Sequence, residues 1–296
     1  MNDTPTMTYA SKGFSLVELM VAMVLGLMLL AGVISMFIAN RQVYRTNENI
    51  SRLQEAARIV NELMGREIRA AGGNQCGARP PLPPTSFSPP PWWSQWSNPP
   101  ADFGIKGYDN NATISAVGFH SGSGTPNAGD RAPKSAVQYD SHALLIRTAT
   151  LHDSGSSAAV LSCTLGASTP PTVSTSPQAG AINAPLDASF WYVGYNGRTR
   201  SDGSASTSLY RLNMSGNKEE IMEGVTGMEI SYLLRNSGAL ATDYVGASSV
   251  TDWDKVVAVR VKLWLKTAEN ISTSGTQPIT RIVSFTTSIR NREEVQ

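Results

Sequence analysis

The chain has 296 residues, of which 41% are hydrophobic, and a formal net charge of +1 at pH 7. This near-neutral charge argues against a surface that coats nucleic acid over its whole area, because such surfaces are strongly basic. The two cysteines and three histidines show no metal-ligand spacing. The sequence therefore predicts no metal site and no cofactor.

The N-terminal residues 12–19 read Lys-Gly-Phe-Ser-Leu-Val-Glu-Leu. An apolar run starts at Phe14, directly after Gly13, and continues to about residue 39 with Glu18 as its one ionisable residue. A run of roughly 20 apolar residues is enough to span the hydrocarbon core of a membrane. A carboxylate in lipid costs at least about 2.5 kcal/mol and marks a functional position by default.

Two ordinary interpretations of this segment fit poorly. A cleaved secretory signal has a shorter apolar stretch that ends in a small-residue cleavage site, whereas this run is longer and has no Ala-x-Ala site at its end. A plain membrane anchor would leave Glu18 unexplained. Residues 41–47 include several polar side chains and are typical of a helix that continues into water.

Residues 12–19 instead resemble the class III leader of type IV prepilins and type II secretion pseudopilins. The resemblance implies that residues 1–13 are a leader peptide, which a prepilin peptidase removes between Gly13 and Phe14 before it N-methylates Phe14. Glu18 would then be the fifth residue of the mature chain. In that family this glutamate is thought to pair with the N-terminal amine of a neighbouring subunit, which offsets the cost of burying its charge.

The helix is predicted to continue beyond the membrane segment. Residues 14–39 would form a transmembrane and filament-core helix, and residues 40–72 its amphipathic continuation, ending at Gly72-Gly73. One apolar face recurs at steps of three and four residues, which is typical of a helix that packs on a globular head; its members are Ile50, Leu53, Ala57, Val60, Met64, Ile68 and Ala71.

Residues 73–296 are long enough for one sizeable periplasmic or extracellular head, or for two small lobes. Proline is concentrated in residues 80–100, which also contain Trp92, Trp93 and Trp96. Proline removes hydrogen-bond donors, so the sequence predicts an extended loop here. The tryptophans could form a partner-binding surface. The favoured alternative is a lid that folds back over the core of the head, because large exposed apolar patches are uncommon.

The second half of the head has the period-two alternation of antiparallel strands. The clearest strand is 257–266, with 283–289 as its partner, and residues 164–180 are predicted to be a surface loop. A long helix against an antiparallel sheet is an α+β architecture, here of the type IV pilin kind. Further strands are predicted at 144–148, 190–195, 209–213 and 228–235.

Residues in the C-terminal part of the chain make the resemblance more specific, because they point to one family of pilin-like proteins. Asp252-Trp253, the strand 256–261, Arg281, Phe285 and the tail 289–292 are similar to the PilW family of minor pilins, as is the helix exit at residues 66–76. The resemblance implies a non-enzymatic minor pilin that joins an initiation or tip complex of a type IV pilus and supports twitching motility, adhesion or DNA uptake. Its alternatives are a minor pseudopilin of type II secretion and a tip adhesin that binds carbohydrate or a surface through the tryptophan-rich loop.

The same resemblance implies partners and a location. The partners would be the prepilin peptidase, other minor pilins, the major pilin, the inner-membrane assembly platform and a tip adhesin. The protein would cross the inner membrane once, with a periplasmic head, and would lie in the extracellular pilus after assembly. An exported head favours a disulfide between Cys76 and Cys163.

Other candidate sites are weak. No constellation of catalytic side chains is evident, and the acidic turns at 109–111 and 202–204 lack the spacing of a calcium loop. Arg260, Lys262, Trp264 and Lys266 share one strand face, which could contact nucleic acid but is more typical of a solvated sheet face.

Overall fold

The structure is a computed structural model. It describes residues 13, 15–76, 80–81, 92–94, 102–110, 127–133, 137, 139–149, 159–164, 171–200, 203–236, 239–267 and 278–290. The chain divides into two compact units, residues 1–49 and residues 50–296.

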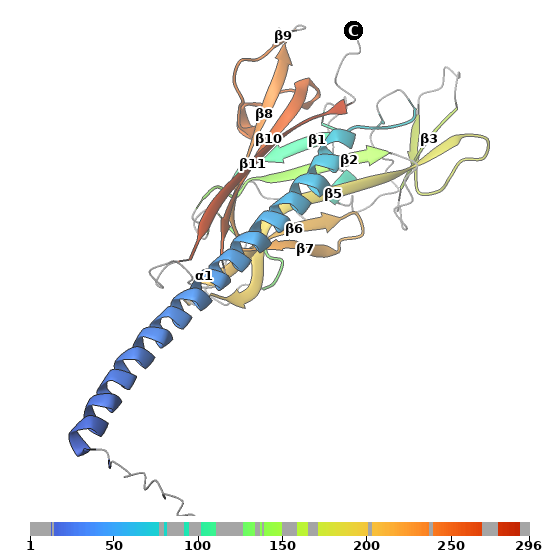
Figure 1. The fold of residues 1–296 in the computed structure, drawn as a ribbon. Coiled ribbons are helices and arrows are strands. Elements are labelled where there is room, and N and C mark those ends of the chain that lie inside the picture. The colour runs from blue at the N-terminus through green and yellow to red at the C-terminus, as the bar shows by residue number, and fades with distance from the viewer. Residues whose placement is uncertain are drawn as a thin grey trace, which may run out of the picture. The chain divides into compact units, whose positions relative to one another are not determined.

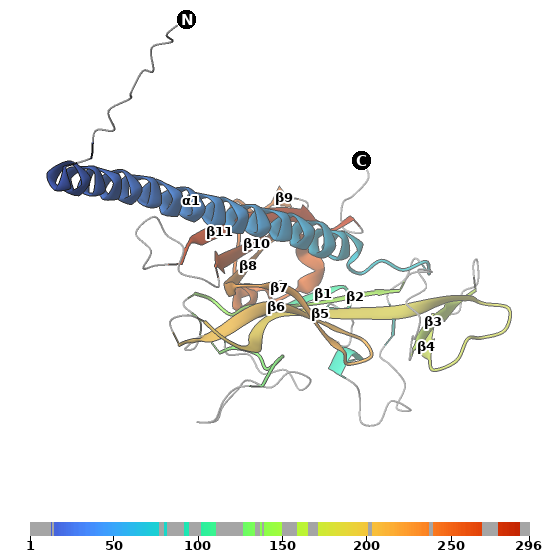
Figure 2. The same cartoon turned by 60° about the horizontal axis from the view of Figure 1, so that its bottom comes forward.

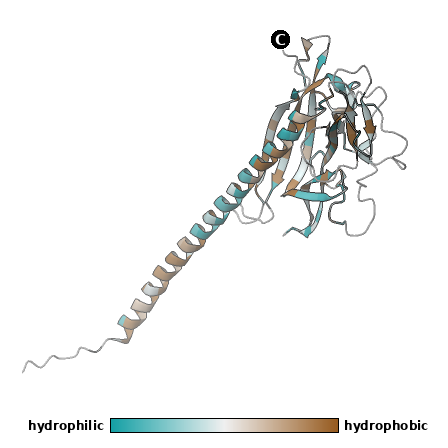
Figure 3. Cartoon of the chain, turned by 90° about the vertical axis from the view of Figure 1, so that its right-hand side faces the viewer, coloured by the Kyte–Doolittle hydropathy of each residue, from teal (hydrophilic) through white to brown (hydrophobic). Residues whose placement is uncertain are grey.

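Among the residues that the structure describes, the first unit contains the first part of one long helix, α1 (Leu16–Ala70). Residues 16–39 contain no proline and two glycines, Gly26 and Gly32, so nothing interrupts the backbone ladder. Every residue of this stretch is exposed, and Figure 3 shows it in the hydrophobic colours. Within the described residues, α1 is the one helix that is long and apolar enough to cross a membrane.

In the second unit, a seven-stranded antiparallel sheet is built around one very long strand, β5 (Ile182–Thr199). Successive parts of β5 pair with different neighbours: its first part with β3, its middle with β2 and its later part with β6, as Figure 2 shows. The other six strands are β1 (Ile105–Tyr108), β2 (Ala143–Ala149), β3 (Val160–Cys163), β4 (Thr172–Ser174), β6 (Ala205–Asn213) and β7 (Lys218–Glu223).

A second antiparallel sheet has four strands in the order β11-β10-β8-β9. Its central pair is β8 (Val225–Asn236) and β10 (Val256–Lys266), and its edges are β11 (Thr280–Ser288) and the short β9 (Ala239–Leu240). Three single-turn 3₁₀ helices complete the described elements: η1 (Trp92–Ser94), η2 (Ala247–Ser249) and η3 (Trp253–Lys255).

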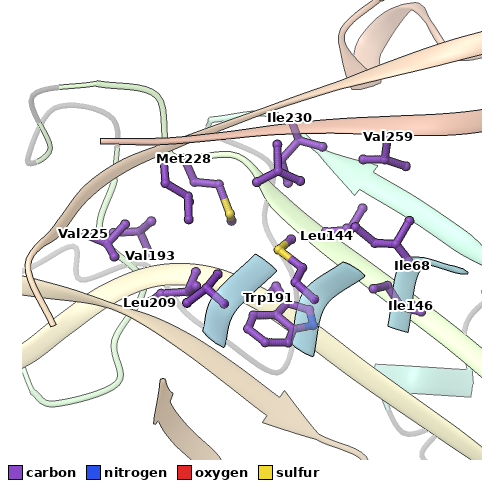
Figure 4. Close-up of a cluster of buried hydrophobic side chains, with 14 of the residues drawn as sticks. Ile68, Leu144, Ile146, Trp191, Val193, Leu209, Val225, Met228, Ile230 and Val259 are labelled. Atoms are coloured by element: carbon purple, nitrogen blue, oxygen red, sulfur yellow. The ribbon is translucent and has the colours of Figure 1, made fainter. Parts of the chain in front are cut away.

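The main core lies where the second half of α1 meets both sheets (Figures 1 and 4). The helix contributes the apolar face predicted from its periodicity, with Val60, Met64 and Ile68 fully buried. Figure 4 shows Ile68 near Leu144 and Ile146 of β2. This amphipathic burial is what holds a helix of mixed polarity on a protein surface. The remaining core residues that Figure 4 labels are Trp191, Val193, Leu209, Val225, Met228, Ile230 and Val259.

The predicted α+β class is therefore confirmed, with two differences. The head has two sheets, because β8 starts a second sheet at Val225, directly after the positive-φ Gly224 that follows β7. In addition, the expected surface loop at 164–180 contains strand β4, so that part of the prediction was wrong. β4 pairs with β3, and its middle residue Val173 is buried. The composition of residues 164–180 gave no sign of this packing.

Candidate functional site

The N-terminal end of α1 carries the first group of candidate residues. Gly13 is described and exposed, whereas Phe14 lies outside the described residues. The helix begins within one turn of Gly13, since Leu19 N donates to Ser15 O at 3.1 Å. Glu18 lies in the first turn, on the exposed surface, where a negative charge also interacts favourably with the helix dipole.

The exposed stretch that follows is apolar on all sides. Its 18-residue window has a mean hydropathy of 2.6, and none of it is buried inside the protein. The hydroxyl of Ser35 in this stretch is bonded to the helix itself, because Ser35 Oγ donates to Gly32 O at 2.9 Å. Glu18 is thus the single charge of residues 13–40. Such a surface is stable only when lipid or other protein covers it.

Further along α1, one half-buried carboxylate, Glu67, connects the helix to the seven-stranded sheet. Glu67 Oε2 accepts hydrogen bonds from Ser189 Oγ and Trp191 Nε1, each at 2.6 Å. Its other oxygen lies 2.8 Å from Arg211 Nε. Three groups from β5 and β6 therefore converge on one helix side chain. Charge-assisted bonds of this kind are stronger than neutral ones, and they set the rotation of the helix on the sheet.

The helix ends in a tight junction with β2. Gly72 has a φ of 72°, and its N–H donates to Arg147 O at 2.9 Å. A Cβ on Gly104 would lie 2.8 Å from the backbone of Gly72, so the two chains approach too closely for a larger residue. The helix exit that resembles the PilW family is therefore packed directly against the sheet.

Arg147 connects this junction to the proline- and tryptophan-rich region. Its side chain is 2% exposed, with Nε donating to Trp93 O at 2.7 Å and Nη1 to Asp102 O at 2.8 Å. Burial lowers the pKa of the guanidinium to about 10, so it stays protonated at neutral pH. Asp102, which is also buried, forms an ion pair with Lys106 at 2.6 Å. A single buried cation thus holds together segments that are distant in the sequence.

The two cysteines form a covalent link in the same part of the head, near Trp93. Cys76 and Cys163 form a disulfide with an S–S distance of 2.18 Å and a Cα–Cα distance of 5.7 Å. The bridge joins the segment after α1 to the end of β3, beside a small second core that includes Trp93, Leu161 and Leu186. Cys76 itself packs against this second core.

Removal of this disulfide is expected to destabilise the head strongly. The bridge closes a loop of 87 residues, for which the chain-entropy estimate is about 4–5 kcal/mol. The double variant Cys76→Ser/Cys163→Ser should lose most of this free energy of unfolding in urea denaturation under non-reducing conditions. Full reduction of the wild-type chain should give the same loss, and an unchanged urea midpoint would contradict a stabilising role.

Of the three tryptophans considered as a partner surface, Trp93 is buried and not available for one. Trp93 is 3% exposed and belongs to the second core, and Trp92 is half-buried against Phe190, with ring centroids 6.4 Å apart. Trp96 lies outside the described residues. For Trp93, the prediction of an exposed binding surface was therefore wrong. The Arg147 hydrogen bond to its carbonyl and the disulfide nearby keep the ring packed inside, as a lid would be.

The candidate polar and metal-binding residues serve the backbone instead. His142 Nδ1 accepts from Ile230 N at 3.0 Å, and Asp109 Oδ2 accepts from Ser248 N at 2.9 Å. Asn110 bonds to Asp140 and Ser141. Within the described residues no group of three or more His, Cys, Asp or Glu could hold a metal ion. His120, His152, Asn111 and Asp202 lie outside those residues.

The basic strand face of β10 is partly covered. Trp264 is 8% exposed, and its ring stacks on Tyr139 with centroids 4.6 Å apart and an interplanar angle of 9°. Arg260 lies 3.7 Å above the Tyr244 ring, and Lys262 pairs with Glu229 at 3.3 Å. The aromatic ring is therefore occupied by the protein's own tyrosine, which leaves little for a nucleic-acid base to stack on.

Sequence reasoning missed Glu67 and Arg147, two charged side chains that join distant segments of the head. Ile68 lies on the buried face of the helix, and Glu67 is its neighbour in the sequence. A carboxylate beside the apolar face of a helix is the sequence feature that could have pointed to Glu67. Arg147 interrupts the otherwise apolar and small residues of β2. A charge inside a buried strand requires internal partners, although the sequence does not say which.

Comparison with known protein families agrees with this geometry. The family model described as "Type IV Pilus-assembly protein W" matches residues 192–291, which run from the middle of β5 to the end of β11. The model described as "Prokaryotic N-terminal methylation motif" matches residues 9–34, including Gly13, Phe14 and Glu18. Searches of curated proteins and of solved structures returned no match.

The two matches lie at opposite ends of the chain and describe one kind of molecule. The methylation motif covers the start of the exposed apolar helix. The other match covers the four-stranded sheet together with β6, β7 and the later part of β5, and both sheets contribute to the core that buries the amphipathic second half of the helix. The chain is a type IV pilin-like protein that resembles the PilW family of minor pilins.

Proposed function

We propose that this protein is a minor subunit of a type IV pilus that acts in assembly, in an initiation or tip complex, rather than by catalysis. The observation that carries the proposal is the single charge, Glu18, in the first turn of an exposed apolar helix that begins just after Gly13. A lone carboxylate there is costly in lipid, and a positive group on a neighbouring subunit would offset that cost.

In this proposal residues 1–13 are removed by the prepilin peptidase, and residues 14–39 pass from the inner membrane to the filament core. Residues 40–72 connect this helix to the head at 73–296, which faces the periplasm before assembly. The partners are other minor pilins, the major pilin and the inner-membrane assembly platform. Twitching motility, adhesion or DNA uptake would be the functions of the fibre that they build.

A minor pseudopilin of type II secretion is the second candidate, because the two systems share the leader. The match to the pilus-assembly family over residues 192–291 favours the pilus. A surface adhesin acting through the tryptophan-rich region has less support, since Trp93 is buried. The packing of β10 gives no comparable support to a nucleic-acid partner.

The first test is the processing of the N-terminus. We expect a mature chain that starts at N-methylated Phe14 in cells with the prepilin peptidase, and an unprocessed chain in cells without it. Intact-mass analysis of the purified protein distinguishes the two. Gly13→Leu should block processing in cells with the peptidase, because the cleavage pattern requires glycine, whereas Gly26→Leu, within α1, should be processed normally.

Cleavage near residue 39 would instead identify a secretory signal. An intact Met1 in both strains would identify a permanent anchor. Either result would remove the basis of the assembly mechanism.

A further inference from the structure

The edge strand β11 has few of the features that usually protect a sheet edge, since Arg281 is its one charged residue. It is nine residues long, contains no proline and no lysine, and pairs with β10 without a register shift. Edges are normally protected by short strands, bulges, lysine or proline. The other described edge strands follow that rule: β1, β4 and β9 have at most four residues, and β7 carries Lys218, Glu219, Glu220 and Glu223.

The register shows which backbone groups of β11 point away from the sheet. Thr267 N donates to Ile279 O, and Ile289 N donates to Val257 O, so both odd-numbered positions bond to β10. Hydrogen-bonded positions alternate along an antiparallel pair, and the register is unbroken between them. The N–H and C=O groups of Ile282, Ser284 and Thr286 therefore point outward, and no described residue bonds to them.

A groove of 330 Å³ lies between the second half of α1 and the β11 side of the second sheet, and it also reaches Leu265 of β10. Five consecutive residues of β11, 281–285, line it. Because alternate side chains point to opposite faces of a sheet, a groove that touches five consecutive residues contacts the backbone of β11 as well as its side chains. Its floor is apolar, with Leu53, Ala57 and Phe285 among the lining side chains.

The charged side chains of the groove have one sign. Arg58 and Arg281 line it, and no carboxylate does. Arg58 is 3.5 Å from Glu55, but both side chains are well exposed, and such pairs contribute little. Arg281 forms no ion pair with a described residue. An occupant with a carboxylate beside its apolar side chains would complement these walls.

We propose that the free edge of β11 binds an extended segment of a partner protein as an added strand, and that this segment alternates apolar side chains and carries a carboxylate opposite Arg281. Strand addition uses outward backbone groups for affinity and alternate side-chain pockets for specificity. A second copy of this chain fits less well, since an added β11 would bring another Arg281 and no carboxylate. The proposal depends only on the head and is independent of the function proposed for Glu18.

Fluorescence anisotropy on the full chain in detergent micelles would test it. The probe is a short fluorescein-labelled peptide in which valine and threonine alternate and one residue is glutamate; its matched control has lysine instead. We expect the glutamate peptide to bind more tightly. Ser284→Pro should weaken binding at least about tenfold, because it removes an outward N–H without breaking a bond to β10. The control Ser284→Thr should bind as the wild type does.

Charge reversal provides a second, independent readout. Arg281→Glu should reverse the preference in favour of the lysine peptide, and this result is interpretable even if Ser284→Pro fails to fold. Failure of both peptides to bind, equal binding of both, or binding that Ser284→Pro leaves unchanged would overturn the proposal. So would a wild-type dimer in sedimentation that Ser284→Pro dissociates, since it would identify a second copy as the occupant.

Discussion

Glu18→Ala is expected to leave the protein in the membrane and to exclude it from the fibre. Without the carboxylate, the helix from Leu16 onward is apolar throughout its exposed first part, so membrane insertion becomes easier. If pairing in the fibre offsets the cost of the carboxylate in lipid, about 2.5 kcal/mol, its loss should change the fibre-to-membrane ratio roughly 70-fold. Quantitative immunoblots of sheared pili and of membranes would measure this ratio.

Matched variants separate charge from other effects. Glu18→Gln keeps hydrogen-bonding capacity without charge and should resemble the alanine variant, whereas Glu18→Asp should retain part of the assembly. Met23→Ala, at an exposed position of the same helix, should assemble as the wild type does. All variants should still be processed after Gly13. A wild-type fibre-to-membrane ratio for Glu18→Ala would contradict the pairing mechanism.

The elements that could be predicted from the sequence are those with a local, repetitive signal. Helix α1 follows from an unbroken apolar run and a three- and four-residue periodicity, and β10 from a strict alternation that ends at Lys266. β1, β3 and β4 have four residues or fewer, too few for a period to be visible. β7 reads Lys-Glu-Glu-Ile-Met-Glu, and its pairing with β6 overrides a composition that is unfavourable for strands.

The contacts that organise the head could not be predicted, because their partners are far apart in the sequence. Glu67 and Trp191 are separated by 124 positions, and Arg147 and Trp93 by 54. The sequence shows that a charge lies beside an apolar face or inside an apolar strand, but only the fold determines which groups satisfy it. The leader is different, because its residues 13–18 are contiguous and can be interpreted without the fold.

These long-range contacts suggest how the protein keeps its helix attached to its head. The apolar face of α1 supplies most of the burial, but burial is non-directional and would tolerate rotation or sliding of the helix. Glu67 is directional, because its Oε2 accepts hydrogen bonds from two specific atoms of β5, while its Oε1 forms an ion pair with Arg211 of β6. A subunit whose helix is anchored in a membrane or fibre would need this kind of attachment if force passes through the helix.

Glu67→Ala is accordingly expected to lower the free energy of unfolding of the head by about 2–4 kcal/mol. The change leaves the fully buried Trp191 N–H without its acceptor, which costs about 1–3 kcal/mol, and removes the ion pair of Arg211. Arg211 retains some contact with water and an ion pair with Glu219 at 3.2 Å. The lost ion pair with Glu67 therefore contributes less to the expected loss of stability than the unpaired Trp191 N–H does. Urea denaturation of the full chain in detergent would measure the loss.

A double-mutant cycle would show whether the carboxylate acts through these partners. Glu67→Gln and Arg211→Met, alone and together, should give an interaction energy of about 0.5–3 kcal/mol. Glu62→Gln is the matched control: it makes the same chemical change on the exposed face of the same helix and should stay within about 0.5 kcal/mol of the wild type. If Glu67→Ala were as mild as that control, hydrophobic burial alone would hold the helix, and the directional role of Glu67 would be wrong.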